Sequence, residues 1–407
     1  MTVEMKTVAS KVAQASRADA LGAGAAAIHG VYPPHANPAT RPLELFKDRT
    51  MPLRKGCVLG LFLPNESWAE FPTLAPTTTE WTYAYNREAT LVAEEAGFEF
   101  VLPPGRWKGL QGDDINWRGA SLDVVTLSAA LLEATRKITV MTTLHTNVFN
   151  PVVAAKFGAD MDQISGGRWA MNIVSGWGAH EFEAMGIPLL DHKARYAYTA
   201  EWLDIVRGLW EHGVFSFEGE HFTIKEATAW PRPVQNPRPL LVNAGQSYTG
   251  MTFSAEQVDY AFSYPANIPT FREICAKVGR EVGFIGNKRI ILGKTDEDAQ
   301  RLAREICDRA DKSAIRQHMV AAGATKKKTI EDLLAKQEDY DRYFLADAII
   351  GSPETVAEGL AEWILTHRPH GCCLQFYNCV EDIRVFAEKT IPLLAKRLGD
   401  EHPLLLS

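Results

Sequence analysis

The amino-acid sequence predicts an α/β protein in which strands and helices alternate to form a (β/α)8 TIM barrel. Eight short apolar or β-branched runs are separated by longer stretches whose apolar residues recur at helical spacing. The first run ends in LPNESW and lacks the glycine-rich turn that a doubly wound open sheet places after its first strand. The open sheet is therefore the less favoured alternative.

The eight runs have the composition of buried strands. They span residues 57–63, 98–102, 138–144, 168–174, 239–244, 258–264, 282–293 and 372–377. Helices are expected between them at 83–96, 122–134, 151–164 and 195–212. In the first helix Ala89, Val92 and Ala96 fall on one face, and the third begins at Pro151, where a helix tolerates proline. The stretch FSFEGEHFTI, residues 215–224, predicts a hairpin.

The N-terminal 55 residues differ in composition from the rest. An Ala-rich polar segment leads into VYPPHANPATRP, whose prolines block helix and favour extended chain, so 1–55 is expected to be an arm outside the barrel. A GxGxxA spacing within it follows no predicted strand, so a dinucleotide loop is not expected. We predict one domain over 56–399, with a helical insertion or lid near 311–345 and a tail at 400–407.

Composition excludes several classes of function. With 46% hydrophobic and 23% charged residues the chain can bury a large core, and its net charge of −7 argues against a nucleic-acid or anionic membrane surface. The six cysteines form no CxxC pair, and no histidine cluster has metal-ligand spacing, so no metal is expected. No run reaches the roughly 18 apolar residues of a membrane span, and no secretion signal is seen. We therefore expect a cytoplasmic enzyme with a small-molecule substrate.

Polar side chains gather where the predicted strands end, and in a barrel these ends share one mouth. The candidates at these ends are Arg106, Thr143, His145, Asn172, Glu181, Gln246 and Ser247. Of these, His145 could act as a base or could simply be packed. The set is rich in amides and hydroxyls but poor in nucleophiles and metal ligands, which is typical of a site where a cofactor supplies the chemistry.

Asn172 lies inside a strand candidate. Because Trp169, Met171 and Ile173 form an apolar face toward the helices, alternation turns Asn172 toward the barrel interior. A buried amide without a partner costs a few kcal/mol, so Asn172 must bond to backbone, water or a ligand. The sequence of this strand alone leaves open the alternative that Asn172 makes only a structural hydrogen bond between strands.

The turn AGQSYTG after the fifth strand could bind an anion. Ser247 can cap the following helix, whose N-terminal amides and dipole favour phosphate, although simple capping is the alternative. Arg195, opening the helix after the fourth strand, is a second candidate for a phosphate or carbonyl partner, with a solvated surface arginine as the alternative.

The motifs ISGGRWAMNIVSGW, EFEAMG, HKARY and NAGQSYTGMTFSA, in this order, resemble the bacterial luciferase-like superfamily of reduced-flavin-dependent monooxygenases. The resemblance runs from about Cys57 to Arg397. Within the superfamily it is strongest to the branch that holds pyrimidine monooxygenase, which opens the uracil ring, and dimethylsulfone monooxygenase. The stretch PPGRWKGLQGDD departs from this pattern, so the substrate cannot be copied from either relative.

The resemblance implies a homodimer or homotetramer that binds FMN at the barrel mouth and receives it reduced, as FMNH2, from a separate NAD(P)H-dependent flavin reductase. Thr143 and Asn172 match positions that hold O2 beside the flavin, and Leu102 matches the apolar wall of that pocket. Flavin contacts carry over to Glu181, Arg195, Tyr196 and Ser247, with Gln246 beside them. Arg106 stands where the family uses a lysine.

The resemblance, together with these residues, implies a two-component monooxygenase that opens a nitrogen heterocycle by C–N cleavage through a flavin peroxide. One alternative is a sulfone or alkanesulfonate monooxygenase that cleaves a C–S bond, with cationic groups supplied by Arg106, Lys108, Arg118 and His145. A more distant alternative is a flavin or F420 hydride-transfer dehydrogenase or a flavin-storage protein, against which the Thr143 and Asn172 pair argues. Four aromatic residues could line the substrate side, although packing in the core is favoured for each: Trp68, Trp107, Phe149 and Phe376.

Overall fold

The computed structural model describes residues 56–176, 178–188, 190–321, 345 and 347–407, which belong to one compact unit. The predicted arm, 1–55, lies outside the described residues. So does most of the predicted insertion, from 322 to 344.

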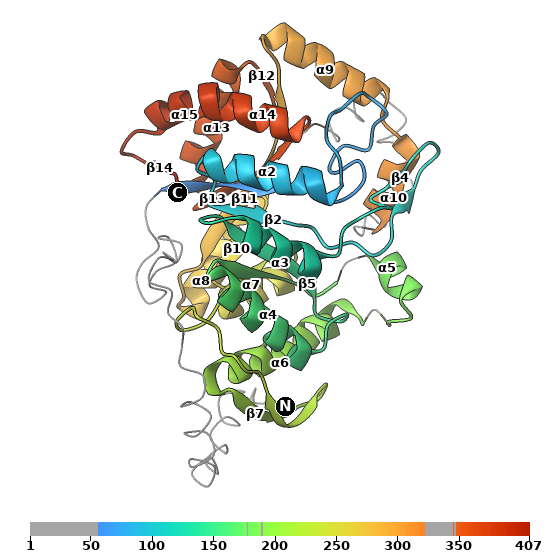
Figure 1. Cartoon of the computed structure of the whole chain (residues 1–407), viewed down its shortest axis with the longest axis vertical. Coiled ribbons are helices and arrows are strands. Elements are labelled where there is room, and N and C mark those ends of the chain that lie inside the picture. The colour runs from blue at the N-terminus through green and yellow to red at the C-terminus, as the bar shows by residue number, and fades with distance from the viewer. Residues whose placement is uncertain (1–55, 177, 189, 322–344, 346) are drawn as a thin grey trace, which may run out of the picture. The chain divides into compact units, whose positions relative to one another are not determined.

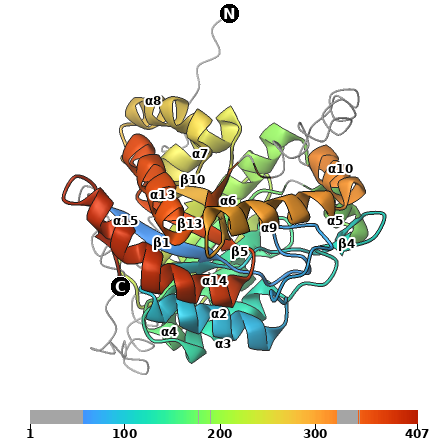
Figure 2. The ribbon, with the colours of Figure 1, turned by 90° about the horizontal axis from the view of Figure 1, so that it is seen from above.

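Eight parallel strands close into a barrel (Figures 1 and 2). They are β1 (Cys57–Phe62), β2 (Phe100–Leu102), β5 (Thr139–His145), β6 (Trp169–Val174), β9 (Leu240–Asn243), β10 (Tyr260–Phe262), β11 (Gly283–Leu292) and β13 (Gly371–Phe376). Each pairs with the next in this order, and β13 returns to pair with β1. The predicted barrel is confirmed, and each of its strands lies within two residues of its predicted bounds.

Helices cover the outside of the barrel, as the view from above shows (Figure 2). They are α2 (Tyr83–Glu95), α3 (Val124–Ala134), α4 (Pro151–Ser165), α6 (His192–His212), α7 (Tyr248–Gln257), α8 (Ile268–Val278), α9 (Asp296–Asp308), α13 (Pro353–His367), α14 (Cys379–Val385) and α15 (Ile391–Leu398). The four predicted helices are present. Helix α6 begins three residues before the predicted start because Asp191 caps it, accepting hydrogen bonds from the amides of Lys193 and Ala194.

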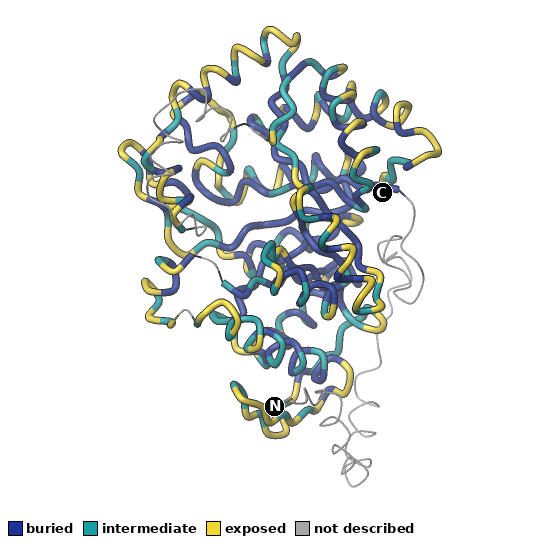
Figure 3. Tube along the Cα trace, turned by 180° about the vertical axis from the view of Figure 1, so that it is seen from behind, coloured by how far each residue is buried: buried dark blue, intermediate teal, exposed yellow. Residues whose placement is uncertain are grey.

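The alternation of strand side chains produces two groups of buried residues. In Figure 3 the buried residues appear as the dark blue centre of the chain trace. Trp169, Met171 and Ile173 pack with the helices, whereas Ala170 packs with Phe100 and other residues of the barrel interior. The predicted faces of this strand are thus confirmed. Phe100 fills the interior because Gly60 leaves room for it: a Cβ on Gly60 would lie 2.1 Å from the ring.

Several short elements extend the loops. The hairpin of β3 (Leu110–Gln111) and β4 (Asn116–Trp117) follows β2, and α5 (Ala179–Ala184) follows β6. The predicted hairpin is found as β7 (Val214–Glu218) and β8 (Thr223–Thr228). Helix α10 (Lys312–Ala321) and strand β12 (Ala348–Gly351) flank the segment from 322 to 344, and β14 (Leu404–Leu405) pairs with β1.

All six cysteines are buried and free. Among the described residues no helix is long and apolar enough to cross a membrane. The same part of the chain holds no group of three or more Cys, His, Asp or Glu side chains placed to bind a metal ion.

Candidate active site

The carboxyl ends of the barrel strands surround a cavity of about 930 Å³, within the size range of cofactor sites. The polar and apolar residues that line it include Leu102, Arg106, Arg118, Thr143, His145, Asn172, His192, Arg195, Tyr196, Gln246, Ser247 and Arg289. A smaller recess of about 130 Å³ shares Leu102, Asn172 and Gln246 with it. All the predicted site residues lie in the described part of the chain, and all of them except Glu181 line this cavity.

Asn172 and Thr143 form a pair on neighbouring strands. They are directly opposite in the β5–β6 register, and Asn172 Nδ2 donates to Thr143 Oγ1 at 3.1 Å. Both side chains are only 4% exposed, yet Asn172 Oδ1 has no hydrogen-bond partner in the structure. A buried acceptor left unpaired in a cavity wall indicates a ligand that donates to it. Leu102 lies in the same wall, on the neighbouring strand β2.

A second group of polar side chains gathers at the start of α7. Ser247 caps this helix by accepting from the amide of Gly250 at 3.1 Å, and its hydroxyl lies 3.0 Å from His192 Nε2. Arg195 donates through Nη1 to the carbonyl of Gly176, while its buried Nε has no partner. A helix N-terminus with an arginine and a histidine beside it suits a phosphate.

The glycines of AGQSYTG make room for Tyr196. A Cβ on Gly245 or on Gly250 would lie 2.5 Å from the Tyr196 hydroxyl. His192 and Tyr196 come from the same face of α6, four residues apart, with ring centroids 5.4 Å apart. The sequence prediction missed His192, although its spacing from Arg195 and Tyr196 in HKARY places all three on one helix face.

Gln246 lines the cavity, but its amide is bonded to the backbone. Its Nε2 donates to the carbonyls of Ala244 and Phe262, and its Oε1 accepts from the amide of Tyr264 at 3.1 Å. Gln246 therefore holds the loops after β9 and β10 together, which fixes the wall beside Ser247.

Glu181 is buried behind the wall rather than exposed in it. Its Oε2 accepts from the Trp107 amide at 3.1 Å, and burial raises the pKa of its carboxyl. Arg106, which does line the cavity, lies with Nε 3.3 Å from Glu66 Oε2. In this structure Glu181 shapes the β2–α3 loop that presents Arg106.

His145 is buried in the wall next to Gly105 and Arg106. Burial, with a contribution from Arg106, lowers the pKa of its imidazole to about 3. Trp107 Nε1 donates to its Nδ1 at 3.5 Å. A ring with so low a pKa stays neutral at pH 7 and accepts a hydrogen bond more readily than a proton.

The low pKa of His145 predicts acid-sensitive stability. The unfolded histidine has a pKa near 6.5 and the folded one about 3, so stability is complete above pH 6.5 and falls as the pH drops toward 3. Between pH 7 and pH 5 the wild type should lose about 2 kcal/mol more free energy of unfolding than His145→Gln. Urea titrations at both pH values check this, and identical losses in the two proteins would contradict it.

None of the four aromatic residues that could line the substrate side is among those that line the cavity. Phe376 points into the core between barrel and helices, Trp68 and Trp107 are exposed, and Phe149 packs against Trp107 and Phe157. The aromatic residues that line the cavity are instead Phe62, Trp117, Tyr196 and Tyr264.

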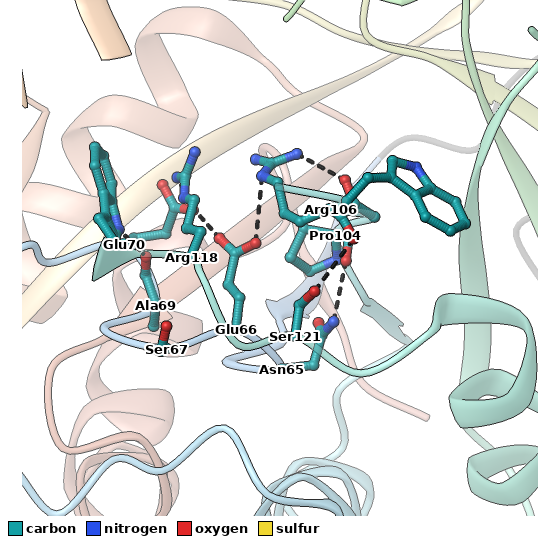
Figure 4. Close-up of polar contacts among 12 residues, drawn as sticks. Asn65, Glu66, Ser67, Ala69, Glu70, Pro104, Arg106, Arg118 and Ser121 are labelled. Carbon is teal, nitrogen blue, oxygen red and sulfur yellow. Dashed lines mark hydrogen bonds and ion pairs between the residues drawn. The ribbon is translucent and has the colours of Figure 1, made fainter. Parts of the chain in front are cut away.

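A charged cluster, of which the sequence analysis named only Arg106 and Arg118, forms another part of the wall (Figure 4). Glu66 lies between Arg118, at 2.7 Å, and Arg106, at 3.3 Å. Arg118 also reaches Glu70 at 2.5 Å, and Glu70 lies 3.6 Å from Arg289. These residues come from three distant stretches of the chain, and no local motif signals their meeting.

Comparison with known proteins now identifies the family. A sequence profile described as luciferase-like monooxygenase matches residues 59–366. The chain belongs to the luciferase-like monooxygenase family. The predicted family, the barrel and the flavin-dependent monooxygenase class are confirmed.

Two relatives within the luciferase-like monooxygenase family cover most of the chain. Pyrimidine monooxygenase RutA of Pseudomonas savastanoi pv. phaseolicola is 32% identical over 357 residues, which are 83% of this chain and 97% of that protein. An FMNH2-dependent dimethylsulfone monooxygenase of Pseudomonas putida is 30% identical over 354 residues, 82% of this chain and 94% of that protein. The crystal structure of riboflavin lyase with modified FMN and riboflavin shares the fold, with a TM-score of 0.75 at 19% identity over 86% of this chain and 97% of that one.

Proposed function

We propose that this enzyme is the oxygenase component of a cytoplasmic two-component system and that it opens a nitrogen heterocycle by cleaving a C–N bond. A separate NAD(P)H-dependent flavin reductase would supply FMNH2, and the oxygenase would act as a homodimer or homotetramer. The observation that carries the proposal is the buried Asn172 and Thr143 pair, with an unpaired acceptor in the wall of a cofactor-sized cavity. The 32% identity to a pyrimidine monooxygenase supports the ring-opening reaction.

The residues of the cavity fit FMN. Ser247, the amides at the start of α7, His192 and Arg195 would hold the phosphate, and Tyr196 would pack beside the flavin. When bound, reduced FMN supplies the two electrons that let one atom of O2 enter the substrate while the other leaves as water.

Thr143 and Asn172 would then position O2 and the reacting atoms. The Asn172 carbonyl oxygen accepts a hydrogen bond, and the Thr143 hydroxyl, which accepts from Asn172, has its own proton available to donate. The apolar side chain of Leu102 beside them would keep water from this part of the cavity.

A second candidate is cleavage of a C–S bond in a sulfone or sulfonate, favoured by the guanidinium groups of Arg106 and Arg118 in the wall. Hydride transfer is the poorer alternative because a hydride site has no need of the Thr143 and Asn172 pair.

Product analysis separates these reactions. The protein, chemically reduced FMN and air would be mixed with uracil-type and pyridine-type rings and with small sulfones and sulfonates. We expect a ring-opened oxygenated product from a heterocycle, with neither sulfite from the sulfonates nor sulfinate from the sulfones. Release of sulfite or sulfinate would establish C–S cleavage instead, and hydrogen peroxide as the sole product from every compound would refute both reactions.

A further inference from the structure

Arg118 is held on three sides at the cavity wall. Its Nε and Nη2 pair with Glu66 and Glu70, and the face of its guanidinium stacks on Trp117, with Cζ 4.2 Å from the ring centroid. Its remaining nitrogen, Nη1, is buried without a hydrogen-bond partner, although Arg118 is only 4% exposed. Figure 4 shows the two carboxylates that fix this side chain.

Arg289 extends the same part of the wall from β11. It reaches Glu70 at 3.6 Å, and its own Nε is also buried without a partner. Arginine stays charged in proteins, and a buried donor left unpaired costs free energy. Both arginines line the same cavity, and each has a buried N–H donor without a partner.

The backbone that carries Arg118 is strained. Arg118 itself has φ of 61°, and Trp68 and Ala69 in the facing loop have φ of 60° and 42°, which are left-handed values unfavourable for residues other than glycine. The two loops are tied by the Arg118 amide to the carbonyl of Ser67, at 3.0 Å, and by Trp117 Nε1 to the carbonyl of Ala69, at 2.7 Å. Such strain persists where the surroundings fix it and concentrates at binding sites.

The electrostatics of this region favour a negative ligand. Burial alone would raise the pKa of the Glu70 carboxyl, but Arg118, Arg289 and Arg106 together hold it below its ordinary value. Within the cluster the guanidinium groups of Arg106, Arg118 and Arg289 face only two carboxylates, those of Glu66 and Glu70, which leaves one positive charge in excess. A neutral ligand would leave the charge-assisted hydrogen bonds unused.

The cluster lies away from the phosphate end of the cavity. It is built from the loops after β1 and β2 and from β11, whereas Ser247 follows β9, which faces β1 across the ring of strands. Asn172 and Thr143 come from the strands between β2 and β9. A ligand bound at Arg118 would therefore sit on the substrate side.

We propose that Arg118, Arg289 and Trp117 form an anion subsite in the wall of the large cavity, which binds a carboxylate or a sulfonate group of the substrate. The inference rests on the proposed function, because the group belongs to the ring that is oxygenated. The substrate is then an acidic heterocycle rather than a neutral one, and the anion subsite selects it before any chemistry occurs.

Matched pyridines test this without turnover. Nicotinate, pyridine-3-sulfonate and nicotinamide share a ring and differ in charge and head group, and their affinities for the protein loaded with oxidised FMN can be measured by calorimetry. We expect nicotinate or pyridine-3-sulfonate to bind about tenfold to hundredfold more tightly than nicotinamide. The preferred anion identifies the head group. Equal affinities, or no binding of either anion, would overturn the proposal.

Two variants and one control locate the effect. In Arg118→Gln and in Arg289→Gln the preference for the anion should fall to about one, whereas Arg301→Gln, an exposed arginine on α9, should keep it. If Arg118→Gln does not fold, Arg289→Gln decides, because its side chain is partly exposed and only weakly paired. Retention of the preference in Arg289→Gln would refute the assignment.

The affinities for FMN and riboflavin complete the test. Both should be unchanged in Arg289→Gln, since the flavin phosphate is assigned to the Ser247 end. A loss of FMN affinity without a loss of riboflavin affinity would mean that the anion subsite at Arg118 and Arg289 holds the flavin phosphate instead. Because these are binding measurements, their failure is distinct from a failure to detect an oxygenated product.

Discussion

Asn172→Ala is expected to lower the rate of product formation about 100-fold to 1000-fold while FMN affinity changes little. The reason is that Asn172 supplies the buried acceptor at the reacting end of the cavity, whereas the phosphate is assigned to Ser247 and its neighbours. Removal of one preorganised polar group in a water-excluded site typically has an effect of this size. Single-turnover assays with reduced FMN would measure the product, and fluorescence quenching would measure FMN affinity.

The fate of O2 in this variant distinguishes a reacting-site role from a structural one. We expect FMNH2 to be oxidised with release of hydrogen peroxide in place of product. Asn150→Ala, which removes an exposed helix-capping amide at the start of α4, serves as the control and should keep its product yield. A product yield in Asn172→Ala above half that of the wild type would contradict the role assigned to this residue.

Thr143→Val and Thr142→Val should differ in their effect on turnover although the residues are adjacent. Thr143 faces the cavity and bonds to Asn172, so its replacement should lower product formation about tenfold or more, beyond any loss of stability. Thr142 faces the helices, where it donates to Ser128 and accepts from Trp169 Nε1, both at 2.8 Å. Its replacement leaves a buried tryptophan N–H unpaired and should cost about 1–3 kcal/mol of unfolding free energy, with little change in turnover.

The two measurements are the product yield per FMNH2 and the free energy of unfolding from urea titrations. Valine is close to threonine in shape, so the hydroxyl is the main group removed in each case. If both variants lost activity in proportion to their loss of stability, the distinction between the two faces of β5 would be wrong.

The barrel could be predicted from the sequence because its strands are local patterns. Each buried run is bounded by polar or glycine residues, and alternation within 169–174 is enough to decide which side chains point inward. The same alternation explains why Phe376 packs in the core, since the inward residue at the end of β13 is its neighbour Gln375, which lines the cavity. Residue type alone does not determine the face of a strand.

In the candidate site, too, some residues could be predicted from the sequence and others could not. Thr143, Asn172 and Ser247 stand at strand ends or a helix start and could be found from the sequence and from the family resemblance. For the charged cluster only Arg106 and Arg118 were named from the sequence. Their meeting with Arg289 could not be predicted, because it depends on the closure of the barrel and on two loops in unusual conformations. Contacts between residues so far apart in the chain leave no periodic signal.

The incorporation of oxygen from labelled O2 tests the central claim most directly. The protein would be mixed with photochemically reduced FMN, 18O2 and a panel of uracil-type and pyridine-type rings. The molecular masses of the products would be measured by mass spectrometry. The proposed monooxygenase reaction predicts one 18O atom in a ring-opened product. A product without the label, or label recovered only in hydrogen peroxide, would contradict it.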